Sequence, residues 1–478
     1  MTGTRGPVLD VAFVTAALGP RLRHPAAPAF THNPAHNLPA RTRFDRAVVD
    51  SREVRPGDLF VALPGDRVDG HDYAAAAVAA GAAGVLATRE AAIEGVPLFV
   101  VDDSLAALQD LSAAWRAALP LDVVGVTGSV GKTTTKAIVA AVLGAKYRVQ
   151  ANPLNYNNEI SVPLCLLELK PETQRAVIEM GMYTTGEIAL LCQWAQPRAG
   201  IVLNVGPTHL ERAGSIEAIA EAKSELVQAL PADGVAILNV DDPMVRGMVG
   251  LARSRVMWFG TDDPAEVRAT DVVSHGAEGF EFTLHHQGDT RRLRVRLPGR
   301  HLVSNVLAGA AAGLADGLSL RQVGDAIEAL AVPTRMRVIT RPDGTRIIDD
   351  TYNAQPSSML AALDLVDEMP GRHIALLGDM RELGVASGYE HQRVGERAGE
   401  VLDALVTLGD EARTLGEAAL AAGGGEIHHA TSREEAAALL WTLVRPGDVV
   451  LVKGSHALGL EAVVAELERS RGPEEPER

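Results

Sequence analysis

A glycine-rich stretch, GVTGSVGKTTTK at residues 125–136, constrains the fold of this chain more than any other feature. It follows an apolar run at 121–127, LDVVGVT, and leads into KTTTKAIVAAVLGA at 132–145, which has helical spacing. A strand that turns through glycines into a helix is typical of parallel α/β sheets, and it directs backbone N–H groups at an anion. Lys132 is placed to reach the outer phosphates of a nucleotide, and the Thr133 hydroxyl suits Mg²⁺. The stretch therefore predicts a nucleotide-binding α/β domain.

The spacing of this glycine loop (residues 125–133) departs by one from the usual G-x-x-x-x-G-K-[ST] pattern. Counting back from Gly131, the expected glycine position holds Val126, whereas Gly125 comes one residue earlier. The alternative is a glycine-rich turn without a ligand, but the G-K-T-T-T ending between a strand and a helix favours a nucleotide. The residues predicted to hold it are Gly125, Thr127, Gly128, Ser129, Gly131, Lys132, Thr133 and Thr134.

Apolar runs alternate with helical patterns along most of the 478 residues, and they divide into three blocks. The blocks are 1–102, 103–331 and 332–478. Short continuous apolar runs between helices predict parallel sheets covered on both faces. The stretch 265–298 instead alternates apolar and polar residues, which predicts antiparallel strands attached to the central block. We therefore expect a three-domain α/β protein with two doubly wound sheets and a smaller N-terminal α/β unit.

Two polar residues follow strands of the central block. Glu179 lies at the carboxyl end of the strand expected in RAVIEM, and His209 comes just past the strand expected in AGIVLNV. Ligands of open α/β sheets bind at the carboxyl ends of the strands, so both residues are expected near the glycine loop. Glu179 would share a Mg²⁺ with Thr133, and His209 would hold a second metal ion. Taken alone, each would be an ordinary strand-end carboxylate or loop residue.

A further helix, SIEAIAEAKSEL, is expected to begin after Ser215, which has the side chain of an N-cap residue. Lys223 lies on this helix between apolar positions. By itself it would be an ordinary helix lysine.

Composition excludes several classes of function. The net charge of -16 disfavours nucleic-acid binding and an anionic membrane surface, and no apolar run is long enough for a membrane span. The two cysteines, Cys165 and Cys192, lie in apolar stretches, which is typical of buried thiols in a reducing cytoplasm. Residues 20–43 contain three histidines among prolines, and we expect a loop there rather than a metal site. A cytoplasmic protein is predicted.

Several motifs together resemble the Mur ligase superfamily. They are T-G-S-x-G-K-T-T-T, Glu179, NVGPTHLERAGSIEAIAEAKSEL and HLVSNVLAGAAAGLADG. The superfamily has the same displaced glycine in its loop, which accounts for the unusual spacing. The resemblance spans about residues 48–465 and implies ATP-dependent amide formation in peptidoglycan synthesis. It also implies a three-domain fold, in which the first block binds a UDP-sugar, the second binds ATP and the third is a Rossmann-like ligase domain.

Within the superfamily, the resemblance is to the members that join D-alanyl-D-alanine to UDP-MurNAc-tripeptide. DSREVRPGDLFVALPGDRVDGHDYAAAAVAAGA, near the N-terminus, is similar to the UDP-sugar domain of these members and of those that add the third amino acid. IIDDTYNAQPSSMLAAL and LLGDMRELG favour the first group. Four positions depart from the family pattern: Thr334 stands before Arg335 where glycine is common, Thr351 replaces serine, Gln355 replaces asparagine, and His456 stands where arginine is common.

The resemblance implies a role for each matching residue. Lys132 holds phosphates, Thr133 and Glu179 bind one Mg²⁺, and His209 with a carbamylated Lys223 binds the second. A carbamate would turn a cation into the anionic oxygen ligand that Mg²⁺ prefers. Asn305 is expected at the adenine, Arg335 at the γ-phosphate, and Asp350 at the ribose. Further contacts to the nucleotide are expected from Tyr352 and Asn353. Contacts to the two substrates, UDP-MurNAc-tripeptide and D-alanyl-D-alanine, are expected from Ser51, Arg52, Asn157, Asn158, Asn353, Ala354, Pro356 and Lys453.

The implied reaction passes through an acyl phosphate, in an enzyme that is expected to be a monomer. Because the ATP site is divided between the second and third blocks, we expect hinge closure near residue 332. Two other functions remain open: a ligase of the superfamily that acts on another substrate, such as folylpolyglutamate synthetase, and a nucleotide-dependent switch that needs no acceptor amine.

Overall fold

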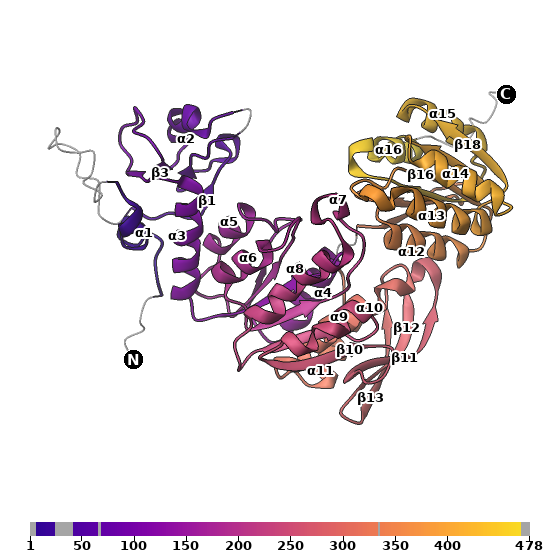
Figure 1. The fold of residues 1–478 in the computed structure, drawn as a ribbon, viewed down its shortest axis with the longest axis horizontal. Coiled ribbons are helices and arrows are strands. Elements are labelled where there is room, and N and C mark those ends of the chain that lie inside the picture. The colour runs from indigo at the N-terminus through magenta and orange to yellow at the C-terminus, as the bar shows by residue number, and fades with distance from the viewer. Residues whose placement is uncertain (1–5, 24–41, 66–67, 333–334, 470–478) are drawn as a thin grey trace.

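The computed structural model describes residues 6–23, 42–65, 68–332 and 335–469. It has three lobes, and the central lobe joins the N-terminal and C-terminal ones (Figure 1). Each lobe contains one sheet, and the sheets have four, nine and six strands. Within the described ranges, no helix is long and apolar enough to cross a membrane. The predicted three-domain α/β fold is confirmed, whereas most of the His/Pro-rich segment at 20–43 lies outside the described residues.

The N-terminal sheet is parallel and small. Its order is β1 (Ala47–Val48), β2 (Leu59–Val61), β3 (Gly84–Ala87) and β4 (Leu98–Val100). Two helices belong to this lobe, α1 (Val11–Leu18) and α2 (Ala74–Ala79). Asp10 begins α1 as its N-cap by accepting a hydrogen bond from the backbone N–H of Phe13 at 2.9 Å.

The central sheet has the strand order β13-β12-β11-β10-β9-β8-β5-β7-β6. Its parallel core comprises β5 (Asp122–Thr127), β6 (Val149–Ala151), β7 (Arg175–Glu179), β8 (Ala199–Val202), β9 (Val235–Asn239) and β10 (Arg255–Gly260). The glycine loop follows β5, which lies between β7 and β8 where the chain changes direction across the sheet. In open α/β sheets such a point is where ligands bind.

The antiparallel extension predicted for 265–298 is present in the structure. It consists of β11 (Val267–Ser274), β12 (Phe280–His286) and β13 (Asp289–Val295), and each neighbouring pair is antiparallel. The join to the core differs, because β11 pairs with β10 in parallel.

Helices cover the central sheet and place the site residues. They are α3 (Ser104–Ala118), α4 (Lys132–Gly144), α5 (Ser161–Leu167), α6 (Glu187–Ala195), α7 (Leu210–Ala213), α8 (Ile216–Ala229), α9 (Pro243–Arg246), α10 (Val303–Ala315) and α11 (Leu320–Glu328). Ser215 caps α8 as predicted, because its hydroxyl accepts a hydrogen bond from the backbone N–H of Ala218 at 3.1 Å.

The C-terminal sheet has the order β14-β15-β19-β16-β17-β18. All pairs are parallel except the edge pair β14 and β15. The strands are β14 (Arg337–Thr340), β15 (Arg346–Asp350), β16 (His373–Gly378), β17 (Ala404–Leu408), β18 (Glu426–Ala430) and β19 (Val449–Lys453). The helices are α12 (Pro356–Asp367), α13 (Ser387–Val401), α14 (Ala412–Ala421), α15 (Arg433–Leu443) and α16 (Glu461–Arg469).

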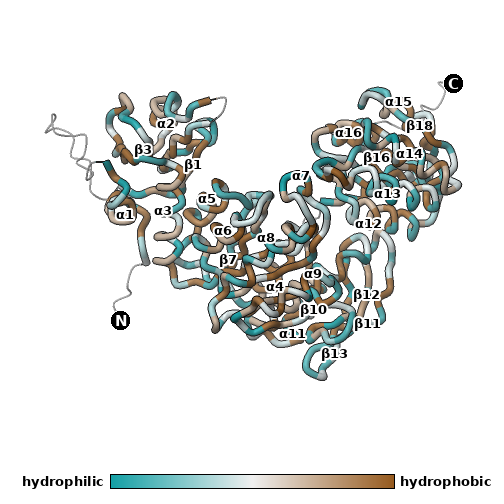
Figure 2. Tube along the Cα trace, in the orientation of Figure 1, coloured by the Kyte–Doolittle hydropathy of each residue, from teal (hydrophilic) through white to brown (hydrophobic). Residues whose placement is uncertain are grey.

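The central lobe is joined to its two neighbours in different ways. One continuous apolar cluster includes Leu59 and Phe99 of the first sheet, Leu108 of α3, and Ile178 and Leu226 of the central lobe. Hydrophobic segments are accordingly concentrated in the inner strands and helices (Figure 2). The C-terminal lobe has its own apolar cluster, against which Ala277 of the central lobe packs, and polar contacts also join the two lobes. The Glu368 carboxylate, for example, accepts a hydrogen bond from Ser274 at 2.5 Å and pairs with Arg300 at 3.2 Å.

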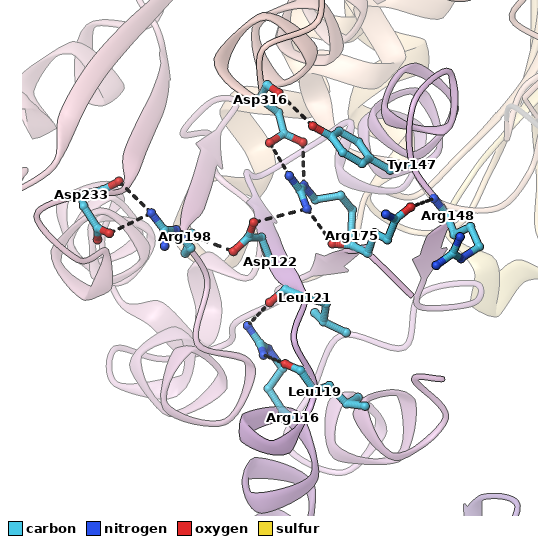
Figure 3. Close-up of polar contacts among 11 residues, drawn as sticks. Arg116, Leu119, Leu121, Asp122, Tyr147, Arg148, Arg175, Arg198, Asp233 and Asp316 are labelled. Carbon is cyan, nitrogen blue, oxygen red and sulfur yellow. Dashed lines mark hydrogen bonds and ion pairs between the residues drawn. The ribbon is translucent and has the colours of Figure 1, made fainter. Parts of the chain in front are cut away.

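The amino edge of the central sheet is fastened by arginines (Figure 3). Arg175 donates two hydrogen bonds to Asp316, at 2.6 and 2.8 Å, and lies 3.3 Å from Asp122. Arg116 is buried and donates to the carbonyls of Leu119, Leu121 and Ala195 at 3.3, 3.0 and 3.0 Å. The two predicted buried thiols are confirmed, and burial raises the pKa of Cys165 and of Cys192 to about 12.

Candidate functional site

The glycine loop turns tightly from β5 into α4. Gly131, just before α4, has a φ of 84°, a left-handed conformation that glycine adopts without strain. A Cβ atom there would lie 2.4 Å from Nδ2 of Asn305. Asn305 comes from α10 and donates hydrogen bonds to the Gly131 carbonyl at 3.2 Å and to Oγ1 of Thr135 at 2.8 Å. Asn305, the residue expected at the adenine, therefore supports the glycine loop by its hydrogen bond to Gly131.

Other side chains fix the outer part of the loop. The amide of Asn204 accepts a hydrogen bond from Val130 N–H at 2.9 Å and donates to its carbonyl at 3.1 Å. The Ser129 hydroxyl donates to Gly206 at 3.0 Å, and the Thr127 hydroxyl donates to Met180 at 3.0 Å. Thr127 and Ser129 thus use their hydroxyls to shape the loop, and the N–H groups of Ser129 and Val130 are both bound to Asn204. Thr134 lies half-buried in the first turn of α4, and Gly125 packs within β5 against Leu226.

Lys132 begins α4 and its side chain folds back over the loop. Its Nζ donates to the carbonyls of Gly128 at 2.7 Å and Ser129 at 3.2 Å. Burial lowers the pKa of Lys132, and the positive charge of Arg335 adds to this effect, whereas Glu179 opposes it. An anion at the loop would replace the weak carbonyl partners with a charged one.

Glu179 is buried at the carboxyl end of β7, where three donors surround it. The Thr133 hydroxyl donates to Oε2 at 2.9 Å, and the Asn157 amide donates to Oε1 at 2.8 Å. The Lys136 ammonium lies 3.3 Å from Oε2. A buried carboxylate beside the Thr133 hydroxyl has the donor set that suits Mg²⁺. Asn157, expected to touch substrate, is held by this carboxylate.

Lys136 is a further residue of the site that was not predicted from the sequence. Besides Glu179, its Nζ reaches the carbonyl of Leu154 at 2.6 Å, and burial lowers the pKa of this ammonium group. It thereby links the carboxylate to the loop after β6. Helical spacing could have predicted that Lys136 lies near the site, because a residue three positions after Thr133 lies on the same face of α4.

His209 stands just before α7 and faces the C-terminal lobe. Its φ is 55°, and its Nδ1 contacts Oε2 of Glu382. The ring of Tyr183 packs edge-on against the imidazole with centroids 4.8 Å apart. Burial lowers the pKa of His209 although Glu382 acts to raise it, and Lys132 and Lys223 lower it further. No sequence pattern indicates the Glu382 contact, which joins residues 173 positions apart.

Lys223 lies on α8 with 2% of its surface exposed. Among the described residues it has neither a hydrogen-bond partner nor a carboxylate partner, unlike Lys136 and Lys453. Burial lowers its pKa well below the usual 10.5, and the charge of Lys132 lowers it further. The amine is thereby driven toward its neutral, nucleophilic form. No group of three or more His, Cys, Asp or Glu side chains able to hold a metal occurs within the described ranges.

The C-terminal lobe contributes a second half to the site. The Arg335 guanidinium donates to the Thr133 hydroxyl at 2.8 Å and stacks on the Tyr352 ring at 3.9 Å. Lys453, at the end of β19, is buried, and its Nζ donates to Asp350 at 2.5 Å and to the Asn353 carbonyl at 2.8 Å. These contacts set the turn before α12, in which Ala354 is buried and Pro356 occupies the first helical turn. His456 lies 6.0 Å from Tyr352 between ring centroids.

The residues expected to bind the UDP-sugar are spread over two lobes. Ser51 and Arg52 follow β1, and Arg52 is paired with Asp50, whose pKa this pairing lowers to about 2. Asn158 lies just before α5, and its Oδ1 accepts hydrogen bonds from the Ser161 N–H at 2.9 Å and hydroxyl at 2.7 Å. No described contact joins Ser51 or Arg52 to the glycine loop. These substrate assignments stay predictions.

Fold and site together define a class: nucleotide-dependent enzymes whose phosphate site is shared by a central parallel-sheet domain and a C-terminal domain. Three family models match the chain, described as Mur ligase family, catalytic domain (47–119), Mur ligase middle domain (126–313), and Mur ligase, glutamate ligase domain (334–456). The chain belongs to the Mur ligase family.

Individual relatives agree with this assignment. The UDP-N-acetylmuramoyl-tripeptide--D-alanyl-D-alanine ligase of Mycobacterium tuberculosis strain H37Rv is 41% identical over 464 residues, which cover 87% of this chain and 90% of the relative. The enzyme of the same name from Escherichia coli K12 is 37% identical, with coverage of 89% and 94%. A crystal structure of MurF from Acinetobacter baumannii superposes with a TM-score of 0.86, at 30% identity, and covers 97% of this chain and 99% of that one. The MurF ligase of Thermotoga maritima, solved in complex with ADP, has a TM-score of 0.78 at 32% identity, with coverage of 89% and 97%.

Proposed function

We propose that this protein is the ATP-dependent ligase that joins D-alanyl-D-alanine to UDP-MurNAc-tripeptide, forming UDP-MurNAc-pentapeptide, ADP and phosphate. The observation that carries the proposal is the 41% identity to ligases of this name, which extends over 87% of the chain. The product is a peptidoglycan precursor, and we place the reaction in the cytoplasm and in a monomeric enzyme.

The first chemical step needs negative charge to be offset. The terminal carboxylate of the tripeptide attacks the γ-phosphorus of ATP, so that the bond to the β–γ bridging oxygen breaks and ADP leaves. Charge grows on the phosphoryl oxygens, and Lys132 with the loop N–H groups stabilises it. Arg335 already lies 2.8 Å from the Thr133 hydroxyl and would reach the γ-phosphate from the other lobe.

The donor set at the carboxyl edge fits Mg²⁺. Thr133 and Glu179 would hold one ion, and His209 with Lys223 would hold a second, which neutralises phosphate charge when bound. An ammonium cannot ligate a cation, but the neutral Lys223 amine can add CO₂ and lose a proton to give a carbamate. Its burial without a partner and its lowered pKa support that modification.

The second step forms the amide. The free amine of D-alanyl-D-alanine attacks the acyl carbon, the C–O bond to phosphate breaks, and a proton leaves the nitrogen. Asn353, Ala354, Pro356 and Lys453 surround the turn before α12, where we place the dipeptide beside the nucleotide. Ser51, Arg52, Asn157 and Asn158 would hold the UDP-MurNAc-peptide, and closure near residue 332 would bring the lobes together. Residues 333–334 lie outside the described ranges.

The test measures phosphate release from ATP and UDP-MurNAc-tripeptide with Mg²⁺, with and without D-alanyl-D-alanine. We expect release that depends on the dipeptide and a product with the mass of UDP-MurNAc-pentapeptide. Release supported by a single amino acid and a shorter acceptor would assign the chain to another ligase of the family. Release that is indifferent to any amine would indicate a nucleotide hydrolase.

A further inference from the structure

Only one site residue of the central lobe, His209, has its side chain fixed by a carboxylate of the C-terminal lobe in the described contacts. Glu382 lies in the segment after β16, and its Oε2 contacts Nδ1 of His209. A backbone contact accompanies this pair, because the Glu211 N–H donates to the Glu382 carbonyl at 3.3 Å. Gly384 packs closely against the same residue of α7, because a Cβ atom at position 384 would lie 3.3 Å from Cα of Glu211. In Figure 1, α7 projects from the central lobe toward the C-terminal lobe.

Backbone conformation marks the same two residues. His209 has a φ of 55° and Glu382 a φ of 65°, and six non-glycine residues of the described chain have positive φ. A left-handed conformation costs a residue with a side chain about 1 kcal/mol or more, and such residues persist where the surrounding structure holds them. Two of these six residues, His209 and Glu382, contact each other across one interface. This indicates that the surrounding structure holds the contact in a specific geometry.

The chemistry of the contact orients the imidazole. With Nδ1 directed at a carboxylate, the ring carries its hydrogen there and leaves the lone pair on Nε2. A carboxylate behind a histidine is the usual partner that fixes ring and tautomer when the other nitrogen binds a metal. The Tyr183 ring, 4.8 Å away, restricts the imidazole from the side. The geometry leaves Nε2 as the nitrogen available at the carboxyl edge.

We propose that Glu382 is a positioning residue that orients His209 across the domain interface, so that the metal site is complete only when the C-terminal lobe is docked on α7. The inference rests on the proposed function for the identity of the metal site. Docking of the C-terminal lobe would then affect the metal site of the central lobe through Glu382, in addition to the contact that Arg335 makes with Thr133. The coupling lies in the contact between Glu382 and His209, with the backbone of Glu211 as its second support.

The test compares Glu382→Ala, Glu382→Gln and Glu368→Ala. Glu368 also crosses the interface, to Ser274 and Arg300, but touches no predicted site residue, so it is the matched control. Mn²⁺ bound with a non-hydrolysable ATP analogue is measured by electron paramagnetic resonance, without muropeptide. We expect Glu382→Ala to weaken Mn²⁺ binding by about 10-fold or more, Glu382→Gln to weaken it less, and Glu368→Ala to leave it unchanged.

A second readout follows the imidazole itself. Nitrogen-15 shifts of His209, assigned with His209→Asn, should show the Nδ1–H tautomer in the unaltered protein and a mixture in Glu382→Ala. Equal Mn²⁺ affinity and an unchanged tautomer in Glu382→Ala would overturn the proposal. Because neither measurement needs ligase turnover, a failure of the proposed substrate assignment leaves this test intact. Thermal melts of all variants establish that they fold.

Discussion

The two edges of the central sheet handle charge in opposite ways. At the amino edge, Arg175 is held by Asp316 and Asp122 (Figure 3). Arg116 donates to three carbonyls at the same edge. At the carboxyl edge, Lys223 is buried without a hydrogen-bonding partner in the described chain, and Lys132 has carbonyls of its own loop. The arginines of the amino edge are satisfied within the protein, whereas at the carboxyl edge Lys136 has Glu179 as its partner but Lys132 and Lys223 have no carboxylate partner in the described chain.

This difference has an energetic meaning. A buried cation without a counter-charge lowers the free energy of unfolding. Cations that pair only with a bound anion therefore destabilise the fold when no ligand is present. A paired cation at the opposite edge contributes to that fold instead. Substitutions at the carboxyl edge should therefore change activity more than stability, and substitutions at the amino edge should do the reverse.

Lys132→Met should give the largest effect. Removal of the ammonium that faces the transferred phosphoryl group should lower kcat by about 10³-fold, in line with the loss of a preorganised charge donor. The free energy of unfolding should stay the same or rise, because burial already lowers the pKa of this group. The measurements are dipeptide-dependent phosphate release and urea unfolding. Lys146→Met is the control: this exposed lysine lies beyond the other end of α4, and its loss should leave kcat unchanged.

Arg116→Met should give the reverse pattern. Three carbonyls lose a charged donor, so we expect the free energy of unfolding to fall by about 3 kcal/mol, while kcat per folded molecule is retained. Urea unfolding followed by circular dichroism measures the first quantity, and the phosphate assay measures the second. A kcat loss comparable to that of Lys132→Met would remove the distinction between the edges.

How well sequence predicts each edge depends on the range of the interactions. The strand, the glycine loop and the first turn of α4 are local, so GVTGSVGKTTTK was sufficient to predict them. Glu179 and His209 were placed at the carboxyl edge because parallel strands end together. The ion pair of Arg175 with Asp316 and the contact of Glu382 with His209 join residues 141 and 173 positions apart, and periodicity carries no information about such pairs.

Polar side chains inside the site were harder to assign for a related reason. Asn305 and Asn158 were predicted to meet ligands, and both stay predictions; in the structure Asn305 donates to the Gly131 carbonyl and Asn158 accepts from the Ser161 N–H. An amide that can contact a ligand can equally satisfy backbone groups, and only the tertiary structure shows which partner is within reach. Lys136 was overlooked although its helical spacing from Thr133 placed it on the same face.

Lys223→Met tests the unpaired cation of the carboxyl edge through the pH dependence of stability. The pKa of Lys223 lies well below 10.5 in the folded protein, and the unfolded chain has the ordinary value. Between the two pKa values the unfolded state binds more protons, so stability rises with pH, and the penalty is gone above about pH 10.5. Lys223→Met should therefore stabilise the metal-free protein at pH 7, and much less at pH 10.

Urea unfolding in EDTA and CO₂-free buffer measures this effect at both pH values. The phosphate assay on the same variant should show severe loss of activity, because methionine cannot form a carbamate. A stabilisation that is equal at pH 7 and pH 10 would contradict the assigned pKa direction. Leu226→Met, on the same helix but apolar, controls for the substitution itself.

The smallest predicted effects distinguish pairs within the amino edge. Asp316 accepts two hydrogen bonds from Arg175 and is largely shielded, whereas Asp233 pairs with Arg198 at 2.8 Å in a contact whose side chains are 68% and 50% exposed. Asp316→Asn keeps the shape but removes the charge from a bidentate pair, and should lower the free energy of unfolding by about 1 kcal/mol. Asp233→Asn should change it by less than about 0.5 kcal/mol, since solvent screens an exposed pair. Both variants should keep kcat, and 0.5 M NaCl should reduce any effect of Asp233→Asn more than that of Asp316→Asn. Equal destabilisation by the two variants would mean that the amino edge is held by its overall charge balance, and the contrast with the carboxyl edge would then rest on Arg116 alone.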